Sequence, residues 1–178
     1  MHTIQLKDKK FAISITETDI QYAVRKVATE ITRDLDGKDP LFVCVLNGAF
    51  MFASDLLKAL NFPCEITFIK LASYEGTKTK GIVKEIIGLN EDIAGRNVVI
   101  VEDIVDTGIT MNSILETLRG KGANSIKIAT FLHKPDALQC NIKIDYVAIN
   151  IPNEFIVGYG LDYNGYGRNL KDIYTVIQ

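Results

Sequence analysis

The amino-acid sequence predicts an α/β fold: a mostly parallel, twisted sheet with helices on both faces and a small hood formed mainly by the C-terminal segment. Two short runs, residues 41–46 (LFVCVL) and 98–101 (VVIV), are apolar throughout, which is typical of strands buried on both faces. Each run is followed by a small polar loop and then by apolar residues at helical spacing. Because this alternation continues to residue 132 without a linker or an internal repeat, we expect a single domain spanning residues 1–178.

The first predicted helix follows Thr18, which with Gln21 has the spacing of a capping box. An apolar stripe then recurs at helical intervals: Ile20, Ala23, Val24, Val27, Ala28 and Ile31. The stripe ends near Asp36 and Gly37. We expect this helix to cover the sheet.

The first strand-loop-helix unit begins with the strand at residues 41–46. Its loop is Asn47, Gly48 and Ala49, and a second helical stripe follows at Phe50, Ala53, Leu57 and Leu60. The next two predicted strands, residues 65–71 and 82–89, flank a polar segment at residues 73–81 (SYEGTKTKG). Two interpretations of that segment stand: a mobile hairpin tip, or a lid that closes over a site.

The central unit spans residues 97–119. Its strand, residues 98–101, is expected to end at Glu102 and Asp103, and a small polar turn occupies residues 106–110. The helix that follows has its apolar stripe at Met111, Ile114, Leu115 and Leu118 and is stopped by Gly120 and Gly122. Two acids and a Thr-Gly loop therefore lie at the carboxyl end of a central strand, where open α/β sheets bind ligands.

The turn at residues 106–110 has the composition of a phosphate site. A loop that opens a helix leaves backbone N–H groups unpaired, Gly108 lets the backbone approach a ligand, and Thr107 and Thr110 add hydroxyl donors. Glu102 and Asp103 suit ribose hydroxyls, or a Mg²⁺ that bridges ribose and phosphate oxygens. The alternative is that the acids only cap a helix and the loop is only a turn.

Another strand is predicted at residues 125–132 and ends at His133-Lys134-Pro135-Asp136, on the same carboxyl edge. We interpret His133 as structural, because alternation along a strand points it away from Lys134. Lys134 is either a solvated surface residue or a donor that selects a carbonyl oxygen. Short strands are expected at residues 146–149 and 170–177.

Composition excludes several classes of protein. The apolar fraction is 47% and the net charge is −2, so nothing in the overall charge favours nucleic acid or a membrane surface. Cys44, Cys64 and Cys140 are odd in number and widely spaced, which indicates reduced cysteines in a cytoplasmic protein. No apolar run has the length of a signal peptide or a membrane span.

Residues 98–111 (VVIVEDIVDTGITM) resemble the signature of the type I phosphoribosyltransferases, and the EDIVDTG form is closest to the hypoxanthine-guanine branch. The resemblance implies that fold and a Mg²⁺-dependent reaction in purine salvage. The 5-phosphoribosyl group of phosphoribosyl pyrophosphate would pass to N9 of hypoxanthine, guanine or xanthine, giving a nucleotide such as IMP or GMP and pyrophosphate. It also implies a homodimer or homotetramer, and a cis peptide between Leu46 and Asn47.

The resemblance also implies roles for individual residues. The 5′-phosphate would lie against Asp106, Thr107, Gly108, Ile109 and Thr110. Ribose or Mg²⁺ would be bound by Glu102 and Asp103, with Asp162 as a further metal ligand. The pyrophosphate site would be Asn47, Gly48 and Arg168, and the lid would carry Ser73 and Tyr74. The purine site would be Lys134, Phe155, Ile156 and Asp162, with Asp106 as the general base.

The sequence departs from the pattern of that family at Asn47, and at Gly165 and Gly167, where larger residues are common. Asn47 stands where Lys or Arg is common, so the pyrophosphate loop lacks that positive charge. Two other functions remain open. A regulator with the same fold could sense a nucleotide without catalysis, since fold alone does not fix function. A phosphoribosyltransferase for another base is the third reading. Lys134 argues against adenine, whose 6-amino group is itself a donor.

Overall fold

The computed structural model describes residues 2–72 and 85–177. The predicted lid, residues 73–81 with Ser73 and Tyr74, lies outside these ranges. Within them, no helix is long and apolar enough to cross a membrane.

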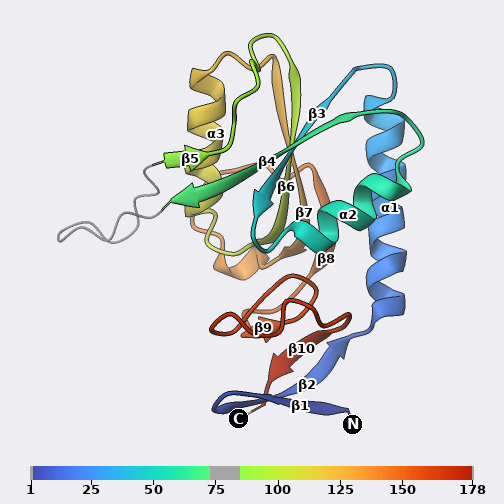
Figure 1. Cartoon of the computed structure of the whole chain (residues 1–178), viewed down its shortest axis with the longest axis vertical. Helices are drawn as coiled ribbons and strands as arrows, with labels where there is room; N and C mark the ends of the chain where they lie inside the picture. The colour runs from blue at the N-terminus through green and yellow to red at the C-terminus, as the bar shows by residue number, and fades with distance from the viewer. Residues whose placement is uncertain (1, 73–84, 178) are drawn as a thin grey trace, which may run out of the picture.

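A six-stranded sheet forms the centre of the molecule, in the order β5-β4-β3-β6-β7-β8 (Figure 1). The strands are β3 (Leu41–Leu46), β4 (Glu65–Ala72), β5 (Glu85–Ile87), β6 (Asn97–Val105), β7 (Ser125–His133) and β8 (Tyr146–Asn150). Neighbours from β4 to β8 are parallel, and β5 is an antiparallel strand at the edge. This sheet confirms the predicted α/β class.

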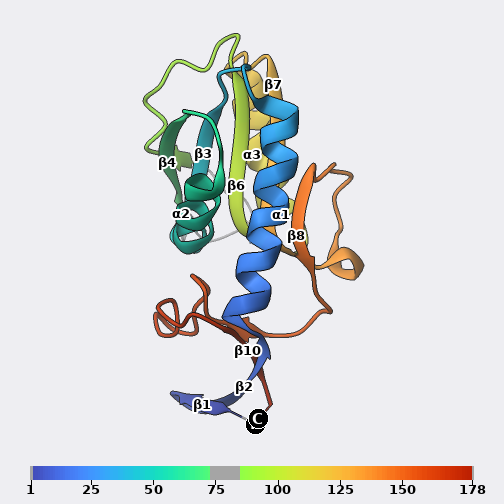
Figure 2. The same cartoon turned by 90° about the vertical axis from the view of Figure 1, so that its right-hand side faces the viewer.

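Helices cover both faces of the sheet, as predicted (Figure 2). Helices α1 (Glu17–Leu35) and α2 (Phe50–Ala59) share one core with Phe42, Cys44 and Phe131. Helix α3 (Ile109–Gly120) packs on the other face, against Val43 and Ile100. A short 3-10 turn, η1 (Pro135–Ala137), follows β7. The all-apolar strands β3 and β6 thus bury side chains in both cores.

The N-terminal cap of α1 is Thr16, not Thr18. The Thr16 side chain accepts a hydrogen bond from the Asp19 backbone N–H, which places Thr18 inside the first turn. Gln21 makes no capping box; its Nε2 donates to Asp55 Oδ2 on α2, at 2.7 Å. The prediction was wrong because three threonine or serine positions precede the helix, and the end of the preceding strand decides between them.

A second sheet of four antiparallel strands forms the hood beyond the carboxyl ends of the parallel strands (Figure 1). Its order is β1 (Thr3–Leu6), β2 (Lys9–Ile15), β10 (Ile173–Val176) and β9 (Ile156–Val157). Both ends of the chain therefore build the hood, which the sequence pattern assigned mainly to the C-terminal segment. Its small core consists of Phe11, Val157 and Tyr174.

Candidate active site

Strand β6 is longer than predicted, and its length creates the site. Pairing of β6 with β3 stops at Val101, opposite Cys44. Pairing with β7 continues to Val105, opposite His133. Glu102 and Asp103 therefore lie inside β6, past the point where β3 leaves it, and not after the end of the strand. The prediction was wrong because pairing with β7 holds these residues in the sheet, and local hydrophobicity does not report such pairing.

A cavity of about 280 Å³ opens where β3 and β6 diverge. Its lining includes Gly48, Glu102, Asp103, Asp106, Thr107, Gly108 and Thr110. Seven residues singled out from the sequence thus share one cavity, although Gly48 comes from a different strand-loop-helix unit. The other predicted site residues among those described do not line it: Asn47, the exposed Ile109, Lys134, Phe155, Ile156, Asp162 and Arg168.

The loop before α3 is shaped by Gly108. Its φ of +80° is left-handed, and a Cβ there would lie 2.8 Å from Leu138 Cδ1. Thr107 Oγ1 accepts a 3.5 Å hydrogen bond from Ile109 N. The first turn of α3 contains no acidic residue, and its N-cap residue, Gly108, makes no side-chain capping bond. Its N–H groups and dipole therefore face the cavity mouth without an anionic competitor, which favours binding of an anion.

Glu102 is buried, with 8% of its surface exposed. Burial, and then the neighbouring Asp103 carboxylate, raise the pKa of Glu102 well above its usual value. Its Oε1 accepts from Asp103 N, and Asp103 Oδ1 accepts from Ile104 N at 2.9 Å. A divalent cation or hydroxyl donors at this pair would offset the repulsion between the two carboxylates. The donor set therefore fits Mg²⁺. No cluster of three metal-ligating side chains exists among the described residues, so substrate or water oxygens would complete the coordination.

Gly48 lies between Asp103 of β6 on one side and Gly160 of the hood on the other. A Cβ on Gly48 would lie 1.6 Å from Asp103 Oδ2, so the carboxylate of Asp103 occupies that space. On the hood side, a Cβ on Gly160 would lie 2.0 Å from Gly48 O. The peptide between Leu46 and Asn47 is cis, as the resemblance implied. Glycine at both positions lets the loop, the acid of β6 and the hood backbone approach one another closely.

Lys134 is buried and paired, so it is not a solvated surface lysine. Only 8% of its surface is exposed, and its Nζ lies 3.0 Å from Asp106 Oδ2. Asn153 Oδ1 also accepts from Lys134 Nζ, at 3.4 Å. Asn153 was not among the predicted site residues, since an asparagine beside a proline reads as a turn. His133 Nδ1 lies 3.0 Å from Asn150 Oδ1 on β8, in keeping with a structural role.

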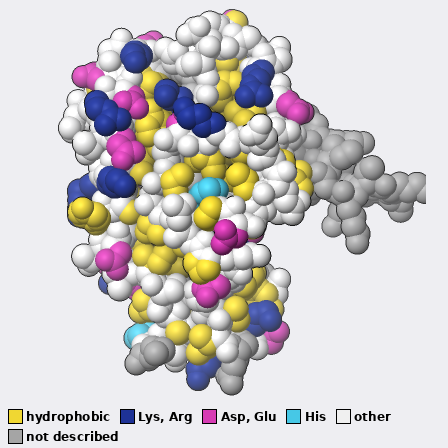
Figure 3. Space-filling model, turned by 180° about the vertical axis from the view of Figure 1, so that it is seen from behind, with side chains coloured by type: hydrophobic (Ala, Val, Ile, Leu, Met, Phe, Trp, Pro, Cys, Tyr) yellow, Lys and Arg dark blue, Asp and Glu magenta, His cyan; other side chains and the backbone are white. Residues whose placement is uncertain are grey.

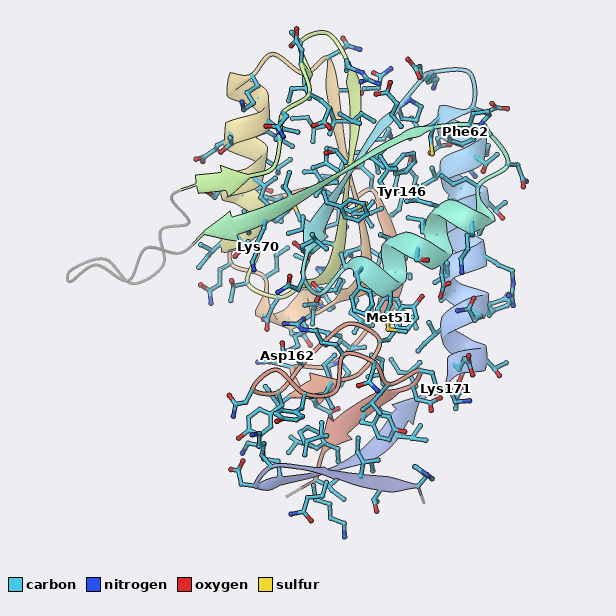
Figure 4. All side chains as sticks on the ribbon, in the orientation of Figure 1. Met51, Phe62, Lys70, Tyr146, Asp162 and Lys171 are labelled. Carbon is cyan, nitrogen blue, oxygen red and sulfur yellow. The ribbon has the colours of Figure 1, made fainter. Side chains whose placement is uncertain are left out.

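The hood contributes a second ion pair. Arg168 Nη2 lies 2.6 Å from Asp162 Oδ1, and its Nη1 donates to Gly160 O at 2.7 Å. Asp162 Oδ2 accepts from Gly165 N, at 2.6 Å. Asp162 lies in the hood loops that face the sheet (Figure 4). Both of its carboxylate oxygens thus have protein partners, which leaves second lone pairs for any other ligand.

Phe155 and Ile156 lie at the start of β9, outside the cavity lining. The Phe155 ring packs edge-on against Tyr163 in the hood, at 5.6 Å between centroids, and 45% of the residue is exposed. Phe155 O accepts from Val176 N, so Ile156 and Thr175 form a non-hydrogen-bonded pair. The backbone N–H and C=O of Ile156 therefore point away from β10, toward the open edge of the hood sheet.

Comparison with known proteins gives a consistent picture. A family model described as a phosphoribosyl transferase domain matches residues 15–164. A hypoxanthine-guanine phosphoribosyltransferase of Streptococcus pyogenes is 42% identical over 159 residues, which cover 89% of this chain and 88% of that protein. A bifunctional TilS/HprT protein of Listeria monocytogenes is 41% identical over 162 residues, but the chain spans only 25% of its length.

Solved structures show the same similarity. A hypoxanthine phosphoribosyltransferase from Staphylococcus aureus superposes with a TM-score of 0.84 at 38% identity, covering 93% of this chain and 91% of that one. A hypoxanthine-guanine phosphoribosyltransferase from Bacillus anthracis gives 0.83 at 34% identity, covering 94% and 97%. The fold and the sequence therefore agree over nearly the whole chain.

Proposed function

The chain belongs to the phosphoribosyltransferase family, and from that premise we propose that it is a hypoxanthine-guanine phosphoribosyltransferase of purine salvage. It transfers the 5-phosphoribosyl group of phosphoribosyl pyrophosphate to N9 of a 6-oxopurine and releases pyrophosphate. The observation that carries this proposal is the pair of the buried Lys134 with Asp106, 3.0 Å apart beside the loop that opens α3.

This pair matches one edge of a 6-oxopurine. Hypoxanthine and guanine present an acceptor at O6 next to N7, which carries a proton in one tautomer. The Lys134 ammonium is a pure donor and suits O6, whereas the Asp106 carboxylate accepts from N7–H. Adenine would place its 6-amino donor against the ammonium. A site built on such a polar contact rejects the mismatched ligand by a factor on the order of 10⁴.

The sugar phosphate is assigned to the β6–α3 segment. The 5′-phosphate lies against residues 106–110, where the N–H groups of the first turn of α3 and the hydroxyls of Thr107 and Thr110 are donors. Glu102 and Asp103 accept hydrogen bonds from the ribose hydroxyls. The buried setting of Glu102 supports this role, because a carboxyl at that place needs donors or a cation near it.

Pyrophosphate is assigned to the contact between the loop after β3 and the hood. The guanidinium of Arg168 and the backbone of Gly48 bind it, and Asn47 adds no charge. Glu102 and Asp103, with substrate oxygens, would hold Mg²⁺, and its positive charge would offset part of the negative charge on the leaving group. Asp162 does not cluster with these two acids among the described residues, so it would serve a separate Mg²⁺ on the pyrophosphate side. Phe155 is proposed to stack on the purine ring, and the outward backbone groups of Ile156 bind its edge.

In the chemical step, the bond between C1 of the ribose and the pyrophosphate oxygen breaks as N9 bonds to C1. The sugar passes through an oxocarbenium-like state. Asp106 takes the N7 proton, and pyrophosphate leaves with the electron pair of the broken bond. Transfer of that proton contributes ~10²–10⁴-fold to the rate. The segment at residues 73–81 is proposed to exclude water, which would otherwise capture the cationic sugar.

The test is a transfer assay with Mg²⁺, phosphoribosyl pyrophosphate and, separately, hypoxanthine, guanine, xanthine and adenine. We expect turnover with 6-oxopurines and none with adenine. Asp106→Asn should lower kcat by ~10²–10⁴-fold while nucleotide binding changes little. Nucleotide binding without turnover on any base would instead identify a non-catalytic regulator.

The assembly and location of the protein are proposals of the same kind. We propose a homodimer or homotetramer, which sedimentation velocity would distinguish. All three cysteines are free, which supports a reducing compartment such as the cytoplasm. Figure 3 shows charged side chains of both signs on one face, with Lys and Arg mainly over its upper half. The net charge of −2 supports small-molecule substrates over nucleic acid.

A further inference from the structure

Tyr159 is a buried residue of the hood to which the mechanism above gives no role. It has 2% of its surface exposed and a φ of +45°. Its ring packs on Phe131 of β7, with 4.7 Å between centroids. Its hydroxyl donates to Asp55 Oδ2 on α2, at 2.8 Å. A hood residue with its ring and its hydroxyl both fixed in the core connects the two parts of the protein.

Asp55 joins three elements at one carboxylate. Besides Tyr159, it accepts a 2.7 Å hydrogen bond from Gln21 Nε2 on α1 and pairs with Lys58 Nζ at 2.8 Å. Burial acts to raise the pKa of Asp55, but the hydrogen bonds from Lys58, Tyr159 and Gln21 outweigh it and lower that pKa. The carboxylate is therefore ionised at neutral pH, and hydrogen bonds to an ionised acceptor are the stronger kind.

The anchored segment leads directly to the proposed pyrophosphate site. Gly160, the next residue, donates from its N–H to Arg168 O at 3.0 Å and accepts from Arg168 Nη1. A Cβ on Gly160 would lie 2.0 Å from Gly48 O, so the two backbones are in contact. On the other side, α2 begins at Phe50, two residues after Gly48, and carries Asp55 in its second turn. One hydrogen bond thus ties both sides of the Gly48–Gly160 contact together.

We propose that Tyr159 and Asp55 are positioning residues for pyrophosphate: their hydrogen bond holds Arg168 and Gly160 in register with the Gly48 loop. The inference rests on the proposed function. Neither side chain lines the substrate cavity, so both act through Arg168 and Gly48. Releasing the bond loosens one half of the site, while the β6–α3 segment and the Lys134–Asp106 pair stay in place. The affected quantity is therefore affinity for the pyrophosphate moiety.

The chain provides a matched control for the test. Tyr146 on β8 is also buried, with 3% exposed, and its hydroxyl donates to Asp34 Oδ2 on α1 at 3.1 Å. Tyr146 lies in the sheet, away from the hood loops (Figure 4). Tyr159→Phe and Tyr146→Phe each remove one part-buried tyrosine–aspartate hydrogen bond and keep the ring. Both should lower the Tm, but only the first should change the site.

The measurements are KM for phosphoribosyl pyrophosphate, KM for hypoxanthine, kcat, and the Kd of magnesium pyrophosphate by calorimetry. In Tyr159→Phe we expect the phosphoribosyl pyrophosphate KM and the pyrophosphate Kd to rise about tenfold, the worth of one charge-assisted hydrogen bond. Its hypoxanthine KM should stay within about twofold of the wild-type value. Tyr146→Phe should leave all four quantities unchanged.

Asp55→Asn supplies an independent variant, because the amide oxygen still accepts from Tyr159 as a weaker, neutral partner. Its pyrophosphate Kd should lie between those of the wild type and Tyr159→Phe. Equal effects of Tyr159→Phe and Tyr146→Phe on an active enzyme would overturn the inference and leave the proposed function intact. A wild-type protein that transfers to no base would overturn both.

Discussion

Replacing Gly48 with alanine tests how closely Asp103 lies against the loop after β3. The added Cβ would meet Asp103 Oδ2 at 1.6 Å, whereas contacts of a real Cβ under 3.0 Å essentially never occur. The carboxylate must therefore move by about 1.4 Å, the difference between these two distances. That shift breaks the 2.9 Å hydrogen bond that Asp103 Oδ1 accepts from Ile104 N.

The size of the effect follows from that movement. Loss of the hydrogen bond and a strained rotamer together cost ~1–2 kcal/mol of the free energy of unfolding, because Asp103 is only half-buried. Activity should suffer more. A displacement of about 1 Å in a positioning group can lower the rate ~10²-fold, so kcat/KM for phosphoribosyl pyrophosphate should fall by about that factor.

A double-mutant cycle with Asp103→Ala isolates the clash. Alanine at residue 103 has no carboxylate, so Gly48→Ala in that background should change the free energy of unfolding by less than ~0.5 kcal/mol. Gly120→Ala is the control, since a Cβ there meets nothing within 4 Å. Urea unfolding of the four proteins and the control measures each value. If Gly48→Ala is equally destabilising with and without the Asp103 carboxylate, the assigned clash is wrong.

Three further predictions use other features of the fold. Gly108→Ala places a Cβ 2.8 Å from a leucine carbon at a residue with φ +80°, so urea unfolding should show a loss of ~2–4 kcal/mol in the free energy of unfolding. Gly37→Ala is the control, with φ +73° and open space around the Cβ, and should lose ~1 kcal/mol. Equal losses in the two variants would contradict the clash at Gly108. The pKa of Asp55 is lowered in the folded protein, so the ionised carboxylate stabilises the fold at neutral pH, and this contribution is lost as pH falls below the ordinary pKa of about 3.9. Asp55→Asn should therefore make the Tm depend less on pH on the acid side of the Tm–pH curve. Burial raises the pKa of Cys44 to about 12. Iodoacetamide at a pH of about 8 should therefore label Cys140 but not Cys44, as detected by mass spectrometry. Labelling of Cys44 in the folded protein would refute its burial.

Local sequence patterns were sufficient for the parts of the fold that are themselves local. The strands β3 and β6 and the stripes of α1 and α3 were found because burial on two faces, or on one helical face, leaves a period in the sequence. The stripe predicted for α2 was wrong at Phe50, which is 41% exposed, and at Leu60, which lies beyond the helix, whereas Phe52 and Leu56 are buried. The end of β6 was missed because pairing with β7 carries the strand through Glu102 and Asp103. The hairpin of β1 and β2 was also missed, although Phe11, Ile13 and Ile15 alternate as a half-buried strand should.

The candidate site divides in the same way. Residues 102–110 form one continuous segment, so their shared cavity could be expected from strand-loop-helix order alone. The burial of Lys134 could not, because a lysine is usually exposed and its partner Asp106 is 28 residues away in the sequence. Asn153 and Tyr159 gave no signal of their own, since each acquires its contact only when the hood closes on the sheet.

The Lys134–Asp106 pair nevertheless follows from the register of the sheet. Val105 of β6 lies opposite His133 of β7, and Lys134 N donates to Val105 O at 3.0 Å. The residues that follow these two strand ends, Asp106 and Lys134, therefore lie side by side at the carboxyl edge. A slip of one residue would put His133 or Pro135 beside the acid, and neither offers an ammonium. The proposed preference for a 6-oxo over a 6-amino purine would thus depend on the pairing of two buried apolar strands, whose register is fixed by packing on both faces.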